Sequence, residues 1–224
     1  MNIIFQGDSI TDALRNRACE VPNRSLGDGY VTFLAAKICA DNIKQDINIY
    51  NKAIGGDMTT DIYARWQKDT LSIDFDVLSL LCGINDIGFR KRLNIGNSIE
   101  KFGFVYERLL FEAREARPDS TIILMAPFIF KMHDLNGEFG SDIYENFSEW
   151  ENDIKKEGEI IQRLSEKYNT LFIPLMDIFE NLCKEIPAEK FSFDCIHPTP
   201  AGNYIIAKEW LAAANKNNIF GKSE

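Results

Sequence analysis

The sequence has no long hydrophobic run, although 45% of its 224 residues are hydrophobic. A membrane-spanning helix needs at least about 18 consecutive apolar residues. The longest apolar run, residues 122–130, is shorter and is interrupted by Pro127. The first six residues also lack the basic start of a secretory signal. We therefore expect no membrane span and no membrane partner.

Cysteine is too sparse and too scattered for a disulfide scaffold. The chain has five cysteines and no CxxC pair, so they cannot all be bonded to one another. They stand at Cys19, Cys39, Cys82, Cys183 and Cys195. This usage is typical of a reduced protein and predicts a cytoplasmic location.

Histidine and positive charge are scarce as well. The two histidines, His133 and His197, form no HxH or HExxH motif, so we expect no metal site. His133 lies in a polar stretch, residues 133–142, which favours a solvated loop. The whole loop is expected over residues 131–147 and could border a substrate. The net charge of −9 disfavours nucleic acid as a partner, because binding phosphates requires a basic surface. It also favours neutral over anionic substrates.

What the sequence does contain is an alternation of short apolar runs and longer amphipathic segments. The runs are rich in Ile, Leu, Val and Phe on both alternating faces, as in strands that helices cover on both sides. They comprise residues 3–5, 47–54, 76–82, 121–127 and 170–175. Strands alternating with helices indicate parallel pairing. We therefore predict one α/β domain over residues 1–224, a three-layer α/β/α sandwich with a five-stranded, mainly parallel sheet.

Helix-start signals precede several of the amphipathic segments. Ser98 is expected to cap a helix that runs to residue 116, and Thr199 followed by Pro200 to cap a last helix that runs to residue 215. Ser148 and Glu151 form a capping-box pattern for a helix that ends near residue 168. A further helix is expected over residues 30–40.

Small polar residues follow the strands, at the sheet edge where open α/β folds bind ligands. Ser9 follows the first run, Gly56 the second and Asn85 the third, and Asp194 and His197 precede the last helix. Each has a simpler explanation: Ser9 or Asp8 could only cap a helix, Gly56 could only form a turn, Asn85 could form an Asx turn, and His197 could be a surface residue. Together they supply a nucleophile, two oxyanion donors, a base and the carboxylate that orients it. This completeness favours a serine hydrolase.

The same positions resemble the motif blocks of the SGNH (GDSL-type) hydrolase family. The resemblance covers residues 3–207 and rests on Gly7-Asp8-Ser9, Gly56, Asn85 and Asp194-x-x-His197. Residues 5–12, 61–66, 83–86 and 196–202 look most like bacterial acetylxylan esterases and related carbohydrate deacetylases. The resemblance implies a flavodoxin-like fold and a catalytic triad of Ser9, Asp194 and His197. It also implies an oxyanion hole from the Ser9 and Gly56 amides and the Asn85 side chain.

The expected activity is hydrolysis of short acyl esters, above all acetyl esters, of carbohydrates such as xylo-oligosaccharides, without a cofactor. A lysophospholipase or thioesterase is the main alternative, because the same residues serve acyl chains of many lengths. A non-enzymatic flavodoxin-like module with Asp8 as an acceptor is a weaker one. The segment 87–95 differs from the deacetylases and is expected to border the cleft, which leaves the substrate open. Intracellular members of the family often associate, so the resemblance leaves a homo-oligomer open, and the sequence does not indicate the oligomeric state.

Several bulky or reactive side chains admit two interpretations. Phe89, Phe128, Phe130 and Trp150 could form a platform for a sugar or pack in the core, and core packing is favoured. Trp66 lies in a helical pattern and is expected in the core. The cysteines near the proposed site, Cys82 and Cys195, are expected to be buried and inert.

Overall fold

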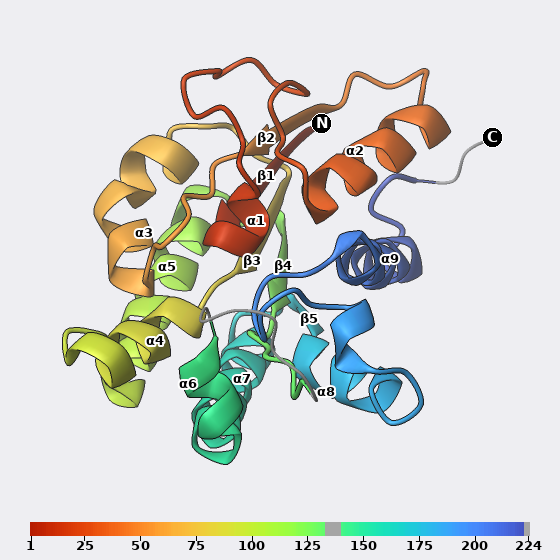
Figure 1. The fold of residues 1–224 in the computed structure, drawn as a ribbon. Coiled ribbons are helices and arrows are strands. Elements are labelled where there is room, and N and C mark those ends of the chain that lie inside the picture. The colour runs from red at the N-terminus through yellow and green to blue at the C-terminus, as the bar shows by residue number, and fades with distance from the viewer. Residues whose placement is uncertain (133–139, 222–224) are drawn as a thin grey trace.

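The computed structural model describes residues 1–132 and 140–221. Its centre is one sheet whose five strands are all parallel, in the order β2-β1-β3-β4-β5 (Figure 1). The strands are β1 (Asn2–Gly7), β2 (Asn48–Asn51), β3 (Val77–Leu81), β4 (Thr121–Met125) and β5 (Leu171–Ile173). This strand order is that of flavodoxin-like folds, and it confirms the predicted fold class.

Helices cover both faces of the sheet (Figure 1). α2 and α9 pack together on one face, and α3, α5 and the second half of α7 cover the other. The helices are α1 (Ser9–Asp12), α2 (Tyr30–Asp41), α3 (Thr59–Trp66), α4 (Ile84–Leu93), α5 (Ile99–Ala116), α6 (Ser141–Glu145), α7 (Phe147–Lys167), α8 (Leu175–Leu182) and α9 (Pro200–Lys216). A π-helical turn, Gln67–Leu71, extends α3, and a 3-10 turn, Ala188–Lys190, follows α8.

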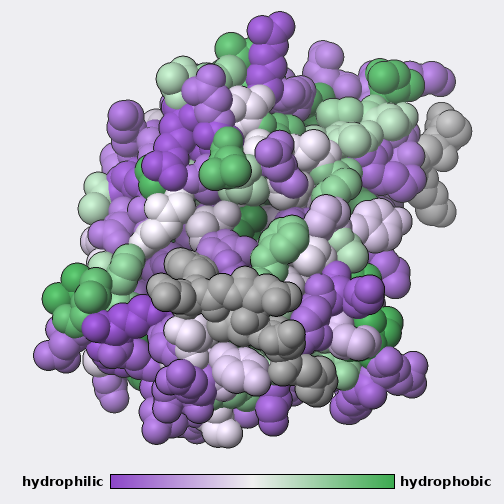
Figure 2. Space-filling view, in the orientation of Figure 1, coloured by the Kyte–Doolittle hydropathy of each residue, from purple (hydrophilic) through white to green (hydrophobic). Residues whose placement is uncertain are grey.

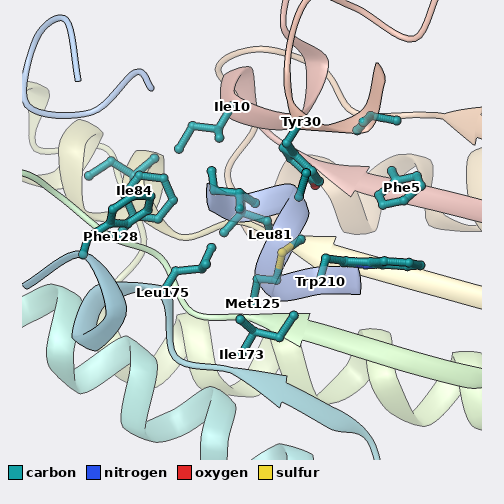
Figure 3. Close-up of a cluster of buried hydrophobic side chains, with 14 of the residues drawn as sticks. Phe5, Ile10, Tyr30, Leu81, Ile84, Met125, Phe128, Ile173, Leu175 and Trp210 are labelled. Atoms are coloured by element: carbon teal, nitrogen blue, oxygen red, sulfur yellow. The ribbon is translucent and has the colours of Figure 1, made fainter. Parts of the chain in front are cut away.

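The alternation of side chains along each strand divides the core into two parts. On the α2/α9 face, Phe5 packs edge-on against Tyr30 and contacts Trp210 (Figure 3). The Trp210 indole donates a hydrogen bond of 3.0 Å to the Ser79 hydroxyl, so this polar strand residue is satisfied inside the core. On the opposite face, Trp66 is buried among residues of β1, β3 and α5, as expected.

Two of the three predicted helix caps are present. The Ser98 hydroxyl accepts from the Lys101 amide, and the Thr199 hydroxyl accepts from the Gly202 amide with Pro200 as the first helical residue. The capping box at Ser148 is wrong. The N-cap position of α7 is Asn146, two residues earlier, because α6 ends at Glu145 and only Asn146 separates the two helices.

Other boundaries differ from prediction where the chain turns at a strand end. The fifth apolar run does not stay extended: Pro174 ends it after β5, and Leu175 begins α8. Part of the predicted polar loop is also helical, since Ser141 and Asp142 belong to α6. His133 and residues 134–139 lie outside the described residues. Most of segment 87–95 forms α4, which ends at Leu93.

All five cysteines are free thiols. Within residues 1–132 and 140–221, no helix is both long and apolar enough to cross a membrane.

Candidate active site

Ser9 lies at the carboxyl end of β1, where the chain turns directly into α1. Gly7 is required in this turn, because a Cβ there would collide with the Leu81 carbonyl oxygen and the Thr11 hydroxyl. The Asp8 carboxylate accepts a hydrogen bond of 3.0 Å from the Ile10 amide and so caps α1. Capping is therefore done by Asp8, and the Ser9 hydroxyl remains available for another partner.

That partner is His197, which precedes the last helix in the sequence. The Ser9 Oγ lies 3.0 Å from His197 Nε2, and His197 Nδ1 lies 2.7 Å from Asp194 Oδ2. The structure thus joins three residues of the predicted site in one chain of hydrogen bonds, across 188 residues of sequence. In this arrangement an imidazole can take the proton of the hydroxyl while the carboxylate holds its other nitrogen.

The Asp194–His197 turn is fixed by its own first residue. Asp194 Oδ1 accepts from the amides of Ile196 (3.1 Å) and His197 (2.7 Å), which leaves Oδ2 for the imidazole. Cys195 adopts a left-handed φ of 70°, and its carbonyl accepts from the Phe130 amide at 2.8 Å. A non-glycine residue in this conformation costs about 1–2 kcal/mol, and the bond to Phe130 anchors the turn that contains it.

The charges of this pair are set by contact with each other. Burial opposes ionisation of Asp194, but hydrogen bonds from the His197 side chain and amide outweigh it and lower the pKa of the carboxyl. The hydrogen bond to Asp194 raises the pKa of His197 above its usual value, against a smaller opposing effect of burial. The pair therefore favours a carboxylate beside an imidazole that accepts a proton readily.

Asp8 has a different environment, although it adjoins Ser9. It is fully buried, and burial raises its pKa to about 7, with the Ile10 amide acting in the opposite direction. A carboxyl of this kind changes charge near neutral pH, within the electrostatic reach of His197.

The Gly55–Gly56 turn after β2 lies beside Ser9. A Cβ at Gly55 would stand 3.5 Å from the Ser9 Cβ, and the Gly55 amide donates to Asp12 Oδ2 at 2.7 Å. Gly56 has a φ of +92° and open space around it, so its backbone conformation, not crowding, favours glycine. Its amide is the second oxyanion donor that the sequence suggests.

Asn85 reaches the same turn from β3. It lies in the first turn of α4, not in an Asx turn, and its Nδ2 donates to the Asp57 carbonyl at 3.1 Å. The next residue, Asp86, is buried and accepts from the Thr59 amide at 3.0 Å and the Thr59 hydroxyl at 2.6 Å. These hydrogen bonds connect the start of α4 to Asp57 and Thr59, which closely follow Gly56. They therefore fix the position of Asn85 relative to the Gly56 turn.

Two supporting residues have no role in the sequence interpretation. Asp12 joins α1 to the Gly55 amide, and Arg65 joins α3 to the Gly56 turn through Lys52 and Asp57. Asp12 and Asp86 each stand within or next to a motif block. An acid beside a motif residue is a signal that could have suggested a bridging role. Arg65 also stands within one of the stretches that resemble the deacetylases, residues 61–66.

The remaining candidates take structural positions. Phe128, Phe130 and Trp150 are buried, which confirms core packing, and Phe89 is half-buried. Burial raises the pKa of the Cys82 thiol well above its usual value and that of Cys195 to about 11, so neither supplies a thiolate. The described residues include no group of three or more His, Cys, Asp or Glu side chains placed to hold a metal ion.

Comparisons with known proteins agree with this geometry. Residues 5–205 match the model of the GDSL-like lipase/acylhydrolase family. An acetylxylan esterase from Geobacillus stearothermophilus is 28% identical over 93% of this chain and 91% of its own length. The crystal structure of an acetylxylan esterase from Geobacillus stearothermophilus superposes with a TM-score of 0.81 and 26% identity, over 95% of this chain and 93% of that one.

A second solved structure is similar over the same extent. A putative GDSL-like lipase from Parabacteroides merdae has a TM-score of 0.84 and 30% identity, and it covers 96% of this chain and 95% of its own. The family match spans most of the 224 residues and all the predicted site residues. The chain belongs to the GDSL-like lipase/acylhydrolase family and is a carboxylic ester hydrolase.

Proposed function

We propose that this esterase removes short acyl groups, above all acetyl, from carbohydrates such as xylo-oligosaccharides, with Ser9 as the nucleophile. The observation that carries the proposal is the chain of hydrogen bonds from Ser9 through His197 to Asp194. It lies at the sheet edge where this fold binds ligands.

In the first half of the reaction, Ser9 Oγ attacks the ester carbonyl carbon as His197 Nε2 takes its proton. The amides of Ser9 and Gly56 and the Asn85 side chain stabilise the negative carbonyl oxygen. The bond from carbon to the alcohol oxygen then breaks, and the alcohol leaves with the proton from His197. Ser9 is left acylated.

In the second half, water takes the place of the alcohol. His197 accepts a proton from the water as its oxygen attacks the acyl carbon. The bond to Ser9 breaks, the Ser9 oxygen regains the proton, and the carboxylic acid leaves. Asp194 keeps its negative charge throughout and stabilises the imidazolium in each half. These steps need no cofactor.

The substrate class rests on the relatives. The Geobacillus relative is named an acetylxylan esterase, and another structure of it is described as an acetyl-xylooligosaccharide esterase. Its structures include catalytic mutants at a serine, at an aspartate and at a histidine three residues after the aspartate, the spacing of Asp194 and His197. The net charge of −9 also favours neutral substrates.

The substitution Ser9→Ala tests the nucleophile. We expect kcat for 4-nitrophenyl acetate to fall by about 10⁶-fold, as when the serine of such a triad is removed, with an unchanged circular dichroism spectrum. Ser72→Ala, at an exposed serine, is the matched control and should retain full activity. Substantial turnover by the Ser9 variant would reject Ser9 as the nucleophile.

The length of the acyl group is tested on the wild-type enzyme. Faster hydrolysis of 4-nitrophenyl acetate than of the octanoate, together with release of acetate from acetylated xylo-oligosaccharides, is expected. A preference for octanoate would support a lysophospholipase or thioesterase.

A further inference from the structure

A cavity of about 480 Å³ opens beside Ser9 and His197. Its volume is within the range of pockets that hold small molecules of several rings and is large for a two-carbon acyl group. Half of the side chains that line it are apolar: Ile10, Ala13, Leu14, Phe193, Pro198 and Pro200. Figure 2 shows the face of the molecule on which α1 lies toward the viewer, with a hollow near its centre.

The reacting atoms define which part of an ester this cavity faces. His197 Nε2 must reach the oxygen of the departing alcohol, since that oxygen takes its proton. The carbonyl oxygen must instead point toward Gly56 and Asn85. His197 lines the cavity, whereas Gly56 and Asn85 are not among the described residues that line it. The cavity therefore lies on the side of His197 and the alcohol, away from Gly56 and Asn85.

Phe193 is the side chain that gives this cavity its character. It immediately precedes Asp194, and 62% of it is exposed, whereas Phe128 and Phe130 are buried. Leu14, on the α1 side of the same cavity, is 91% exposed. An aromatic ring offers a flat apolar surface on which the C–H face of a sugar ring can pack. Covering such a ring removes apolar surface from water and so contributes binding energy.

Polar groups of the cavity suit the hydroxyls of a neutral sugar. The Arg17 guanidinium is half exposed and pairs with the buried Asp12, and the Asp28 carboxylate is exposed at the cavity. These three groups offer both donors and acceptors. Two carboxylates against one guanidinium also disfavour a negatively charged alcohol.

We propose that this cavity binds the alcohol part of the ester as a neutral pyranose ring, and that Phe193 is the contact that selects a sugar over a small alcohol. The proposal rests on the function proposed above, because it needs Ser9 and His197 in their catalytic roles. It adds the binding site for the leaving group.

The test compares two acetates that differ only in the alcohol, mono-acetylated xylobiose and methyl acetate. For Phe193→Ala, we expect the ratio of kcat/KM for the sugar ester to that for methyl acetate to fall about tenfold, which corresponds to about 1.4 kcal/mol. Phe193→Tyr keeps the ring and should restore the ratio. Phe104→Ala, at a phenylalanine on α5 that is 73% exposed, is the matched control and should leave the ratio unchanged.

Three results would overturn the proposal. The first is an unchanged ratio in Phe193→Ala. The second is a shift in preference between methyl acetate and methyl hexanoate, which would place the acyl chain in the cavity. The third is a lower molecular mass of the variant by light scattering, which would assign Phe193 to a contact between copies of the chain. Failure of the proposed function is recognised separately, because Ser9→Ala would then still hydrolyse methyl acetate.

Discussion

Two turns at the carboxyl edge of the sheet carry site residues, and each contains or contacts a buried or half-buried carboxyl group. In the Asp194–His197 turn, both oxygens of Asp194 accept hydrogen bonds, and the pKa of this carboxyl is lowered. In the turn before α4, Glu157 packs so tightly against Gly83 that a Cβ there would collide with its carboxyl oxygen. Neither oxygen of Glu157 has a hydrogen-bond partner among the described residues. Burial raises the pKa of Glu157 well above its usual value.

The comparison shows that partners, and not residue type, decide the charge of a carboxyl group near this site. The two groups must affect stability in opposite directions. In the folded protein, Asp194 stays ionised at pH values below the pKa that its carboxyl has in the unfolded chain. Its contribution to the free energy of unfolding is therefore present above that pKa and is lost as the pH falls. Glu157 keeps its proton in the folded protein at pH values at which the same carboxyl is already ionised in the unfolded chain. The free energy of unfolding therefore decreases as the pH rises above about 4.3, the usual pKa of a glutamate.

The largest expected effect comes from replacing the partnered carboxylate. Asp194→Asn should lower kcat for 4-nitrophenyl acetate by about 10⁴-fold, because the amide favours the wrong imidazole tautomer and does not stabilise imidazolium. Its residual activity should persist to lower pH, since the bond that raises the pKa of His197 is lost. Asp41→Asn, at an exposed aspartate, is the control. If the activity of the variant falls at the same low pH as that of the wild type, Asp194 does not set the pKa of His197.

The second largest effect is expected for Asn85, the side-chain oxyanion donor at the start of α4. Asn85→Ala should lower kcat by about 10²–10³-fold with little change in KM, because the donor acts on charge that develops only in the transition state. Asn85→Asp keeps the size of the side chain but not the donor, and should lose as much. A rise in KM at constant kcat would instead indicate that Asn85 binds the substrate.

The smallest effect, on stability alone, comes from the unpartnered carboxyl. The free energy of unfolding of the wild type should fall with rising pH by up to about 1.4 kcal/mol per pH unit for each carboxyl that stays protonated in the fold. Glu157→Gln should remove the part of this decrease that comes from Glu157. The measurement is urea unfolding at pH 5, 6 and 7. Asp8 and Asp86 also have raised pKa values and add to the slope, so the difference between variant and wild type isolates Glu157.

Glu159→Gln, at an exposed position two residues further along α7, is the matched control and should retain the wild-type slope. An equal slope in Glu157→Gln and wild type would show that Glu157 is ionised in the folded protein. The contrast with Asp194 would then be wrong.

Most of the fold and the membership of the site could be predicted, since both depend on local patterns. Apolar runs marked all five strands, and the polar residues after them marked the sheet edge. The structure brings Ser9, Asp194 and His197 together as the pattern indicated. Predictions that depended on neighbouring elements were less accurate. The Ser148 cap is absent because α6 stands directly before α7, and the fifth run ends early because Pro174 precedes α8.

The sequence by itself determined the fold class and which residues could do chemistry, because the hydrophobic period and the positions of polar residues after the strands are properties of the chain. The family was indicated by the resemblance of its motif blocks to those of known members. Only the tertiary structure decided which carboxyls have partners, since the groups around Asp194 and Glu157 come from separate elements. It likewise decided that Phe193 is exposed in a cavity beside Ser9 while Phe128 and Phe130 are buried. Burial and partnership depend on contacts between distant segments, which no local pattern records.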